Sequence, residues 1–210
     1  MVLKVDESHS LPNIPPVLGV VQPCSPHSVS GLHDSDPFLR IPPLKRKWSE
    51  RKAHCKKLPI HASKHKILKA IAYHQVVLLK APPASGKTTQ VPQMILDDAL
   101  AMSYPCRIVV SNPKVLGVMG CSGHVSTERG EDTTPESVGY STKRRKSRPN
   151  SLDSILYVTE GTLLHMLDKA FFTHIIIDEV HERTVEVDVL MMKIRALLAT
   201  GCDVPTNLLY

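Results

Sequence analysis

The chain has 210 residues, a formal net charge of +6 and a pI near 9.1. This length suits one domain of ~100–150 residues plus a tail, and it excludes two complete domains of that size together with such a tail. The basic balance favours a polyanionic partner such as nucleic acid without establishing one.

The first segment, residues 1–57, is predicted to be a disordered tail. Eight of the seventeen prolines fall before residue 50, among serine, histidine and aspartate, and neither helical nor strand periodicity runs through this stretch. The part from Lys45 to Lys57 is densely basic. RNA binding, a nuclear localisation signal and a solvated linker all stay open as interpretations of it.

From residue 58 onward, the apolar spacing predicts helices that alternate with short buried strands. A helix is expected around Ile67 and Ile71, followed by a β-branched run at 75–79. Further strands are expected at 107–110, 154–158 and 174–177, and further helices at 88–100, 115–125, 162–167 and 187–198. This alternation predicts an α/β domain over residues 58–200, with a parallel sheet flanked by helices. The polar region 128–150, which holds the basic run 143–146, is expected to be an exposed loop outside the sheet.

The segment from Ala81 to Thr89 follows the first predicted strand and opens a helix, which is the context of a phosphate-binding loop. Backbone N–H groups at such a turn, helped by the helix dipole, can hold triphosphate oxygens. Lys87 would reach the β and γ phosphates, and Thr88 would give its hydroxyl to Mg²⁺. The candidate nucleotide-binding residues of the loop are Ala84, Ser85, Gly86, Lys87, Thr88 and Thr89.

The loop departs from the pattern G-x-x-x-x-G-K-[ST], because Ala81 stands at the first glycine. Ala84 matters more. If its position needs a positive φ, alanine costs ~1–2 kcal/mol relative to glycine, which would weaken nucleotide binding about tenfold. The alternative to a phosphate loop is a chance Gly-Lys-Thr sequence in a turn.

Asp178 and Glu179 come directly after the apolar strand at 174–177. Two isolated charges at the end of a buried strand would be expensive without a metal ion or a water molecule to engage. Asp178 would hold Mg²⁺, and Glu179 would orient and deprotonate the water that attacks the γ phosphorus. The alternative is a strand that runs out into a charged helix cap.

The run D-E-V-H-E-R at 178–183 resembles the DEAH/DExH signature of superfamily 2 helicases. Four further segments resemble family motifs in the expected order: G-K-T-T-Q-V-P-Q at 86–93, E-R-G-E at 128–131, G-Y at 139–140 and T-E-G at 159–161. The resemblance covers about residues 58–198 and is nearest to the RNA-acting branch. It implies a RecA-like P-loop NTPase fold and an ATP-dependent RNA helicase that uses ATP and Mg²⁺.

The resemblance also assigns roles to single residues. Lys114, Thr159 and Gly161 would contact the RNA backbone, and His124 stands where the family has an arginine that stacks on the nucleobase. His181 would act in catalysis by coupling to a second domain. Because Lys114 replaces one arginine and Val115 another, RNA binding is expected to be weak.

After residue 198 the family continues to a Ser-Ala-Thr motif and a second RecA-like domain, whereas residues 201–210 do not resemble that continuation. The segment is therefore interpreted as an altered or truncated end. Two functions follow. The chain is either an incomplete ATP-dependent RNA helicase, whose second RecA-like domain would come from a partner, or a non-catalytic nucleotide- or RNA-binding module.

Cysteines stand at positions 24, 55, 106, 121 and 202, without a C-x-x-C pair. This spacing favours reduced thiols over a disulfide framework or a zinc site. The amino terminus lacks the pattern of a secretory signal, and no segment reaches the ~18 apolar residues of a membrane span. We therefore expect an intracellular protein, in the cytoplasm or the nucleus, that does not engage a membrane.

Overall fold

A computed structural model of the protein describes residues 55–131, 136–151, 153–170, 172–199 and 207–209. The tail predicted at 1–57 lies outside this part of the chain except for its last three residues. Of these, Cys55 is buried and packs with the domain. Among the described helices, none combines the length and hydropathy needed to cross a membrane.

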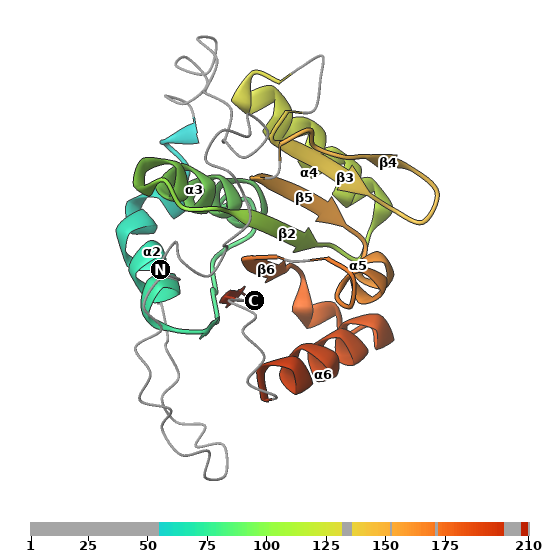
Figure 1. Ribbon diagram of the computed structural model, residues 1–210. Helices are drawn as coiled ribbons and strands as arrows, with labels where there is room; N and C mark the ends of the chain where they lie inside the picture. Colours follow the sequence, from blue (N-terminus) through green and yellow to red (C-terminus); the bar gives the residue numbers. More distant parts are fainter. Residues whose placement is uncertain (1–54, 132–135, 152, 171, 200–206, 210) are drawn as a thin grey trace.

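Helices and strands alternate along the described chain (Figure 1). The helices are η3 (Pro59–Ser63), α2 (Lys64–Tyr73), α3 (Lys87–Met102), α4 (Val115–Arg129), α5 (Glu160–Met166), η4 (Val180–Glu182) and α6 (Val185–Ala199). The strands are β1 (Val76–Val77), β2 (Arg107–Ser111), β3 (Val138–Ser141), β4 (Lys146–Ser147), β5 (Ser154–Val158), β6 (His174–Ile177) and β7 (Asn207–Leu209). Each helix and strand predicted from apolar spacing is present, with ends that differ by up to a few residues.

The strands form one sheet in the order β1-β7-β6-β2-β5-β3-β4. All neighbouring strands run parallel except β3 and β4, which pair antiparallel. The register of β2, β5 and β6 aligns Ser111 with both Val158 and Ile177. These strands therefore end at one edge of the sheet, and the segments that follow them lie beside one another there.

Alternating side chains of the central strands supply two separate cores. On β2, Ile108 and Val110 pack with α2, α3 and α4 in the first core, whereas Val109 belongs to the second core with α5 and α6. Strands β5 and β6 divide their residues between the two faces in the same way. A strand covered on both faces reads as a continuous apolar run, which is why the sequence shows runs rather than polar alternation here. The predicted α/β architecture, a RecA-like parallel sheet flanked by helices, is confirmed.

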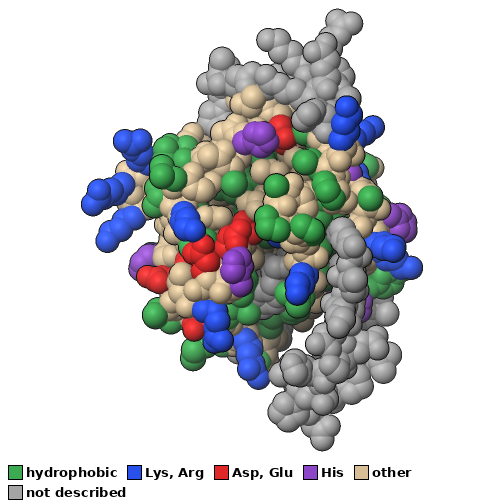
Figure 2. All heavy atoms as spheres, turned by 180° about the vertical axis from the view of Figure 1, so that it is seen from behind, with side chains coloured by type: hydrophobic (Ala, Val, Ile, Leu, Met, Phe, Trp, Pro, Cys, Tyr) green, Lys and Arg blue, Asp and Glu red, His purple; other side chains and the backbone are tan. Residues whose placement is uncertain are grey.

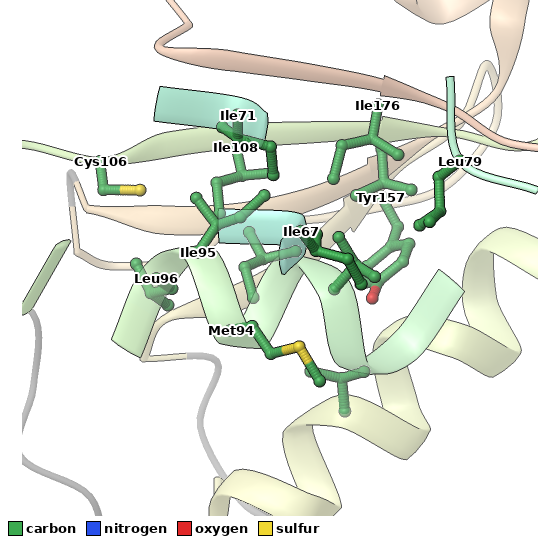
Figure 3. Close-up of a cluster of buried hydrophobic side chains, with 14 of the residues drawn as sticks. Ile67, Ile71, Leu79, Met94, Ile95, Leu96, Cys106, Ile108, Tyr157 and Ile176 are labelled. Carbon is green, nitrogen blue, oxygen red and sulfur yellow. The ribbon is translucent and has the colours of Figure 1, made fainter. Parts of the chain in front are cut away.

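The first core joins α3, the helix that follows the predicted phosphate loop, to the sheet (Figure 3). Met94, Ile95 and Leu96 of α3 are at most 4% exposed, and they lie against strand residues such as Ile108 and Tyr157. Burial of a large apolar side chain contributes about 1.5–3 kcal/mol, so this face of α3 is strongly held. The start of α3 is thereby fixed relative to the strand ends.

The prediction of an exposed loop at 128–150 is wrong in its main part. Helix α4 continues to Arg129, and strand β3 pairs with β5 on one side and β4 on the other. The buried Glu131 carboxylate accepts hydrogen bonds from the backbone N–H groups of Glu136, Ser137 and Val138, which anchors the chain where it enters β3. These polar partners make the segment look like a loop in sequence. The basic residues Lys143 to Lys146 are exposed, as expected.

The prediction for residues 201–210 did not include a strand. Asn207–Leu209 forms β7, which pairs with β6 on one side and β1 on the other. Residues 200–206 and 210 lie outside the described part of the chain. The boundaries proposed at residues 57 and 200 stay predictions.

A glycine in β3 offers a test of the corrected fold. A Cβ at Gly139 would lie 2.4 Å from the carbonyl oxygen of Ser147 and 2.5 Å from Cδ of Pro149. We expect Gly139→Ala to lower the free energy of unfolding by about 1–3 kcal/mol, because the backbone of β4 must move. Urea denaturation measures this change. As a control, Gly120→Ala on the exposed face of α4 meets no atom within 4 Å and should raise stability by up to about 1 kcal/mol. Equal effects of the two substitutions would contradict the pairing of β3 with β4.

Candidate nucleotide-binding site

The loop between β1 and α3 forms a tight turn whose conformation depends on two left-handed residues. Ala84 has a φ of 55° and Gly86 a φ of 96°. The Ser85 N–H bonds to the carbonyl oxygen of Pro82, and the Ser85 carbonyl accepts from Ile60. These bonds close the loop on itself and attach it to η3. The positive φ considered for Ala84 from the sequence is present.

Lys87 is the first residue of α3 and turns back across the loop. Its Nζ donates to the carbonyl oxygens of Ala81 at 2.8 Å and of Pro82 at 3.4 Å. The ammonium group therefore lies against the carbonyl groups at the beginning of the loop. A lysine in this place can exchange carbonyl oxygens for phosphate oxygens without moving its backbone.

The hydroxyl of Thr88 donates to the carboxylate of Asp178 at 2.6 Å, although ninety residues separate them. Asn112 Nδ2 donates to the same Asp178 oxygen at 3.3 Å. Asp178 is only 8% exposed, and its N–H donates to the carbonyl of Ser111, so the end of β2 holds the end of β6. The start of α3 and the segments after β2 and β6 thus bring polar groups to one point: the Thr88 hydroxyl, the Asn112 amide nitrogen and the Asp178 carboxylate.

Tyr157 of β5 connects the sheet to the first turn of α3. Its hydroxyl donates to the backbone carbonyl of Thr88 at 2.9 Å, and its ring is fully buried in the first core (Figure 3). Burial raises the pKa of the Tyr157 hydroxyl well above its usual value, so the group stays protonated and remains a donor. This bond holds the backbone of Thr88 in a fixed position relative to β5.

Glu179 and His181 lie together on the segment that follows β6. His181 Nε2 is 3.3 Å from Glu179 Oε2, and both side chains are open to solvent, at 78% and 39% exposure. Glu179 has a φ of 56°, an uncommon conformation for a residue with a side chain. Such backbone strain is concentrated at functional sites because the surrounding structure must enforce it.

A buried carboxylate joins α3 to α4 behind the loop. Glu128 accepts hydrogen bonds from Nε2 of Gln90 at 2.9 Å, Nε2 of Gln93 at 2.6 Å and the thiol of Cys55 at 3.0 Å. Burial and then the Glu128 carboxylate raise the pKa of Cys55 to about 12, which keeps the thiol as a donor. His124 also contacts Glu128, with its Nε2 at 3.0 Å from Oε1, while 62% of its side chain is exposed.

The residues that the resemblance assigns to RNA lie on two of the segments that follow the parallel strands. Lys114 pairs with Glu182 at 2.7 Å, and this bond raises the pKa of the exposed lysine. Thr159 precedes α5 and its hydroxyl meets that of Thr162 at 2.8 Å. Gly161 lies in the first turn of α5, where an added Cβ would meet no atom within 4 Å.

One face of the molecule shows acidic side chains gathered near its middle, with Lys, Arg and His side chains distributed around them (Figure 2). Within the described residues, no group of three or more His, Cys, Asp and Glu residues could hold a metal ion by itself. The oxygens of Thr88 and Asp178 form a two-residue donor set instead. Hard oxygen ligands in this number fit Mg²⁺, which is bound in proteins by one or two carboxylates together with substrate phosphates.

The sequence missed three residues that build the site: Asn112, Tyr157 and Glu128. Asn112 carried a usable signal, since it is a polar residue directly after a buried strand. Its Oδ1 accepts from the N–H of Lys114, and a Cβ at Gly117 would lie 2.5 Å from that oxygen. Tyr157 looks like any other strand residue, and Glu128 stood out only as the first residue of the E-R-G-E motif, without an assigned role. Only their partners in space reveal their roles.

The left-handed backbone at Ala84 predicts a stabilising substitution. Ala84→Gly removes a strain of about 1–2 kcal/mol and adds conformational freedom to the unfolded chain worth about 0.4–1 kcal/mol. We expect a net gain of about 1 kcal/mol in the free energy of unfolding, measured by urea denaturation. Ala81→Gly is the matched control and should be destabilising, because Ala81 is not among the positive-φ residues. A loss of stability in Ala84→Gly would contradict the strained loop.

No protein-family profile matches the chain. Three proteins named probable ATP-dependent RNA helicase spindle-E are similar to it. Identity is 41% over 151 residues in Drosophila ananassae, 40% over 152 residues in Drosophila melanogaster and 38% over 164 residues in Aedes aegypti. The matches cover 70%, 70% and 76% of this chain, and 10%, 10% and 12% of the respective relatives. More than two thirds of this chain is thus similar to a region of proteins named as probable ATP-dependent RNA helicases. That region makes up only about one tenth of the length of each relative.

Proposed function

We propose that this chain is the nucleotide-binding domain of an ATP-dependent RNA helicase of the DEAH type. The observation that carries the proposal is the contact between Thr88 and Asp178 at 2.6 Å, beside a loop that holds Lys87. A helix hydroxyl, a strand-end carboxylate and a loop lysine are the parts that phosphoryl-transfer sites of the P-loop type require. The similarity to proteins named as RNA helicases supports the choice of family.

The loop residues Ala84 to Thr89 would hold the triphosphate of ATP. Their N–H groups lie at the start of α3, where the helix dipole adds partial positive charge. Lys87 would release the carbonyl oxygens of Ala81 and Pro82 and bind the β and γ phosphates. His124, which is exposed and attached to the same cluster as α3, would offer its ring to the base.

Thr88 and Asp178 would hold Mg²⁺, since both oxygens already converge on one point. When bound, Mg²⁺ neutralises charge on the β and γ phosphate oxygens. Glu179 would act as general base toward the attacking water. His181, at 3.3 Å from Glu179, would orient that carboxylate and transmit contacts from a second domain.

The reaction as a whole would need a second RecA-like domain. The matched relatives are about ten times longer than the region that they share with this chain, so they leave room for such a domain. We propose that it supplies an arginine to the developing charge, a contribution of about 10³–10⁵ in rate in related phosphoryl-transfer enzymes. It would belong to the same longer protein or to a partner.

Lys87→Ala should weaken binding of ATP by about 10- to 100-fold, because a charge-assisted hydrogen bond to phosphate contributes about 1.5–3 kcal/mol. Titration with a fluorescent ATP analogue in the presence of Mg²⁺ measures the dissociation constant. Lys80→Ala is the matched control, since Lys80 is exposed and lies just before the loop. Unchanged affinity in Lys87→Ala would remove the basis of the nucleotide assignment.

Glu179→Gln should leave ATP affinity unchanged and slow hydrolysis by about 10²–10⁴-fold, because it removes a general base and keeps the metal ligand Asp178. Single-turnover hydrolysis, in a protein that joins this domain to a second RecA-like domain, gives the rate. Glu182→Gln makes the same chemical change three residues away and serves as control. Equal rates for wild type and Glu179→Gln would assign the base to another residue.

RNA would bind along the carboxyl ends of the strands, at Lys114, Thr159 and Gly161. Because such contacts go to phosphates, we expect weak, sequence-independent binding that falls steeply with salt. Lys114→Ala should reduce the slope of log affinity against log salt by about 0.7–1. Fluorescence anisotropy with single-stranded RNA at several salt concentrations measures this slope, and Lys66→Ala on α2 is the control. Affinity that is insensitive to salt would contradict the electrostatic account.

A second candidate function is a non-catalytic nucleotide- or RNA-binding module. The strained Ala84 favours it, because a loop selected for rapid turnover would be expected to carry glycine at this φ. The pairing of Lys114 with Glu182 favours it as well, since the lysine must give up that partner to bind phosphate. Binding of ATP without hydrolysis in the two-domain protein would select this candidate.

A further inference from the structure

Helix α6 presents two different apolar faces. Val187, Leu190 and Ile194 are at most 2% exposed, and Leu190 and Ile194 pack in the second core. On the outer side, Val185, Val189 and Met192 are 75%, 46% and 72% exposed, and Ala196 and Ala199 are exposed too. Figure 1 shows α6 below the sheet, in the lower part of the view.

The outer residues follow a strict pattern. Positions 185, 189, 192, 196 and 199 are spaced by four, three, four and three residues. This is the spacing of the apolar seam of a two-stranded coiled coil. An ordinary amphipathic surface helix has charged residues on this side, so α6 carries a second apolar stripe that lies outside both cores of the described part of the chain.

Charged residues flank the stripe in a definite order. Glu186 and Asp188 lie in the first half of α6, and Lys193 and Arg195 lie in the second half. None of the four stands three or four residues from an opposite charge within the helix, so they do not form pairs along it. An acidic first half and a basic second half are complementary when two copies of the helix lie antiparallel.

The register can be worked out from the seam. In an antiparallel pair, Val189 lies opposite Met192 of the second copy, and Val185 lies opposite Ala196. The same register places Asp188 beside Arg195 and Glu186 beside Lys193 across the seam. Apolar layers and charge pairs are therefore satisfied by one arrangement. Lys193 already bonds Asp168 at 2.6 Å, so the pair of Asp188 with Arg195, formed twice by symmetry, carries the charge argument.

We propose that the outer face of α6 is a self-association surface, on which a second copy of this chain docks its own α6 antiparallel about a two-fold axis near residues 190 and 191. Such an interface is isologous, because the same patch serves both subunits. A helix of fifteen residues is only about 22 Å long, which gives an interface smaller than the standard size for stable complexes. The dimer is therefore weak and depends on protein concentration.

Sedimentation equilibrium of the full chain over a concentration series tests the proposal. The average mass should rise from the 23.2 kDa of the monomer toward twice that value. Met192→Glu should keep the protein monomeric, and because Met192 is 72% exposed, circular dichroism and unfolding should match wild type. A monomeric wild-type chain throughout the series, or a dimer that persists in Met192→Glu, would overturn the assignment.

Charge exchange tests the register. Asp188→Arg and Arg195→Asp should each raise the dissociation constant about 3- to 10-fold, because each turns two attractive surface pairs into repulsive ones. The double variant Asp188→Arg with Arg195→Asp should restore wild-type affinity. Lys66→Glu on α2 is a control for the change in net charge. Restoration by Asp188→Arg with Lys193→Asp instead would indicate a parallel pair and contradict the antiparallel register.

Discussion

The hydrogen bond between the Thr88 hydroxyl and the Asp178 carboxylate joins the first turn of α3 to the end of β6, and the candidate site depends on this contact. It exists because β2 and β6 run parallel and end together, so that the Asp178 N–H reaches the carbonyl of Ser111. In an open α/β sheet, ligands bind outside the carboxyl ends of the strands, where such segments meet. A shift of one residue in the pairing of β6 would turn Ile177 to the opposite face and carry Asp178 away from Thr88.

Two further contacts hold the loop in place from other directions. The Tyr157 hydroxyl supports the Thr88 carbonyl from the sheet, and Glu128 binds the amides of Gln90 and Gln93 from α4. Buried polar groups are expensive when they lose a partner, at about 1–3 kcal/mol each, so these networks fix one geometry rather than several. The start of α3 is therefore rigid while its solvent side stays open. This combination would suit the proposed binding of a flexible triphosphate.

Backbone strain occurs in the two loops that meet at the candidate site. Ala84 and Glu179 both have a left-handed backbone, with φ values of 55° and 56°. For Glu179 the strain accompanies an exposed carboxylate that would face the attacking water. For Ala84 it brings no side-chain benefit, since glycine would form the same turn. The helicase proposal and the binding-module proposal differ in how they account for this one position.

The sequence by itself determined the strands β5 and β6 and the helices around them, and it singled out Lys87, Thr88, Asp178 and Glu179 as candidate site residues. Apolar periodicity and turn residues are local properties, so a single chain displays them directly. The tertiary structure alone decided that 138–141 and 207–209 join the sheet and that Tyr157, Asn112 and Glu128 support the site. The role of a buried polar side chain depends on partners that can lie tens of residues away in the sequence. Thr88 and Asp178, which are ninety residues apart, are an example. Local spacing carries no information on such partners, because the free energy of a buried hydrogen bond depends on which groups the completed fold brings into contact.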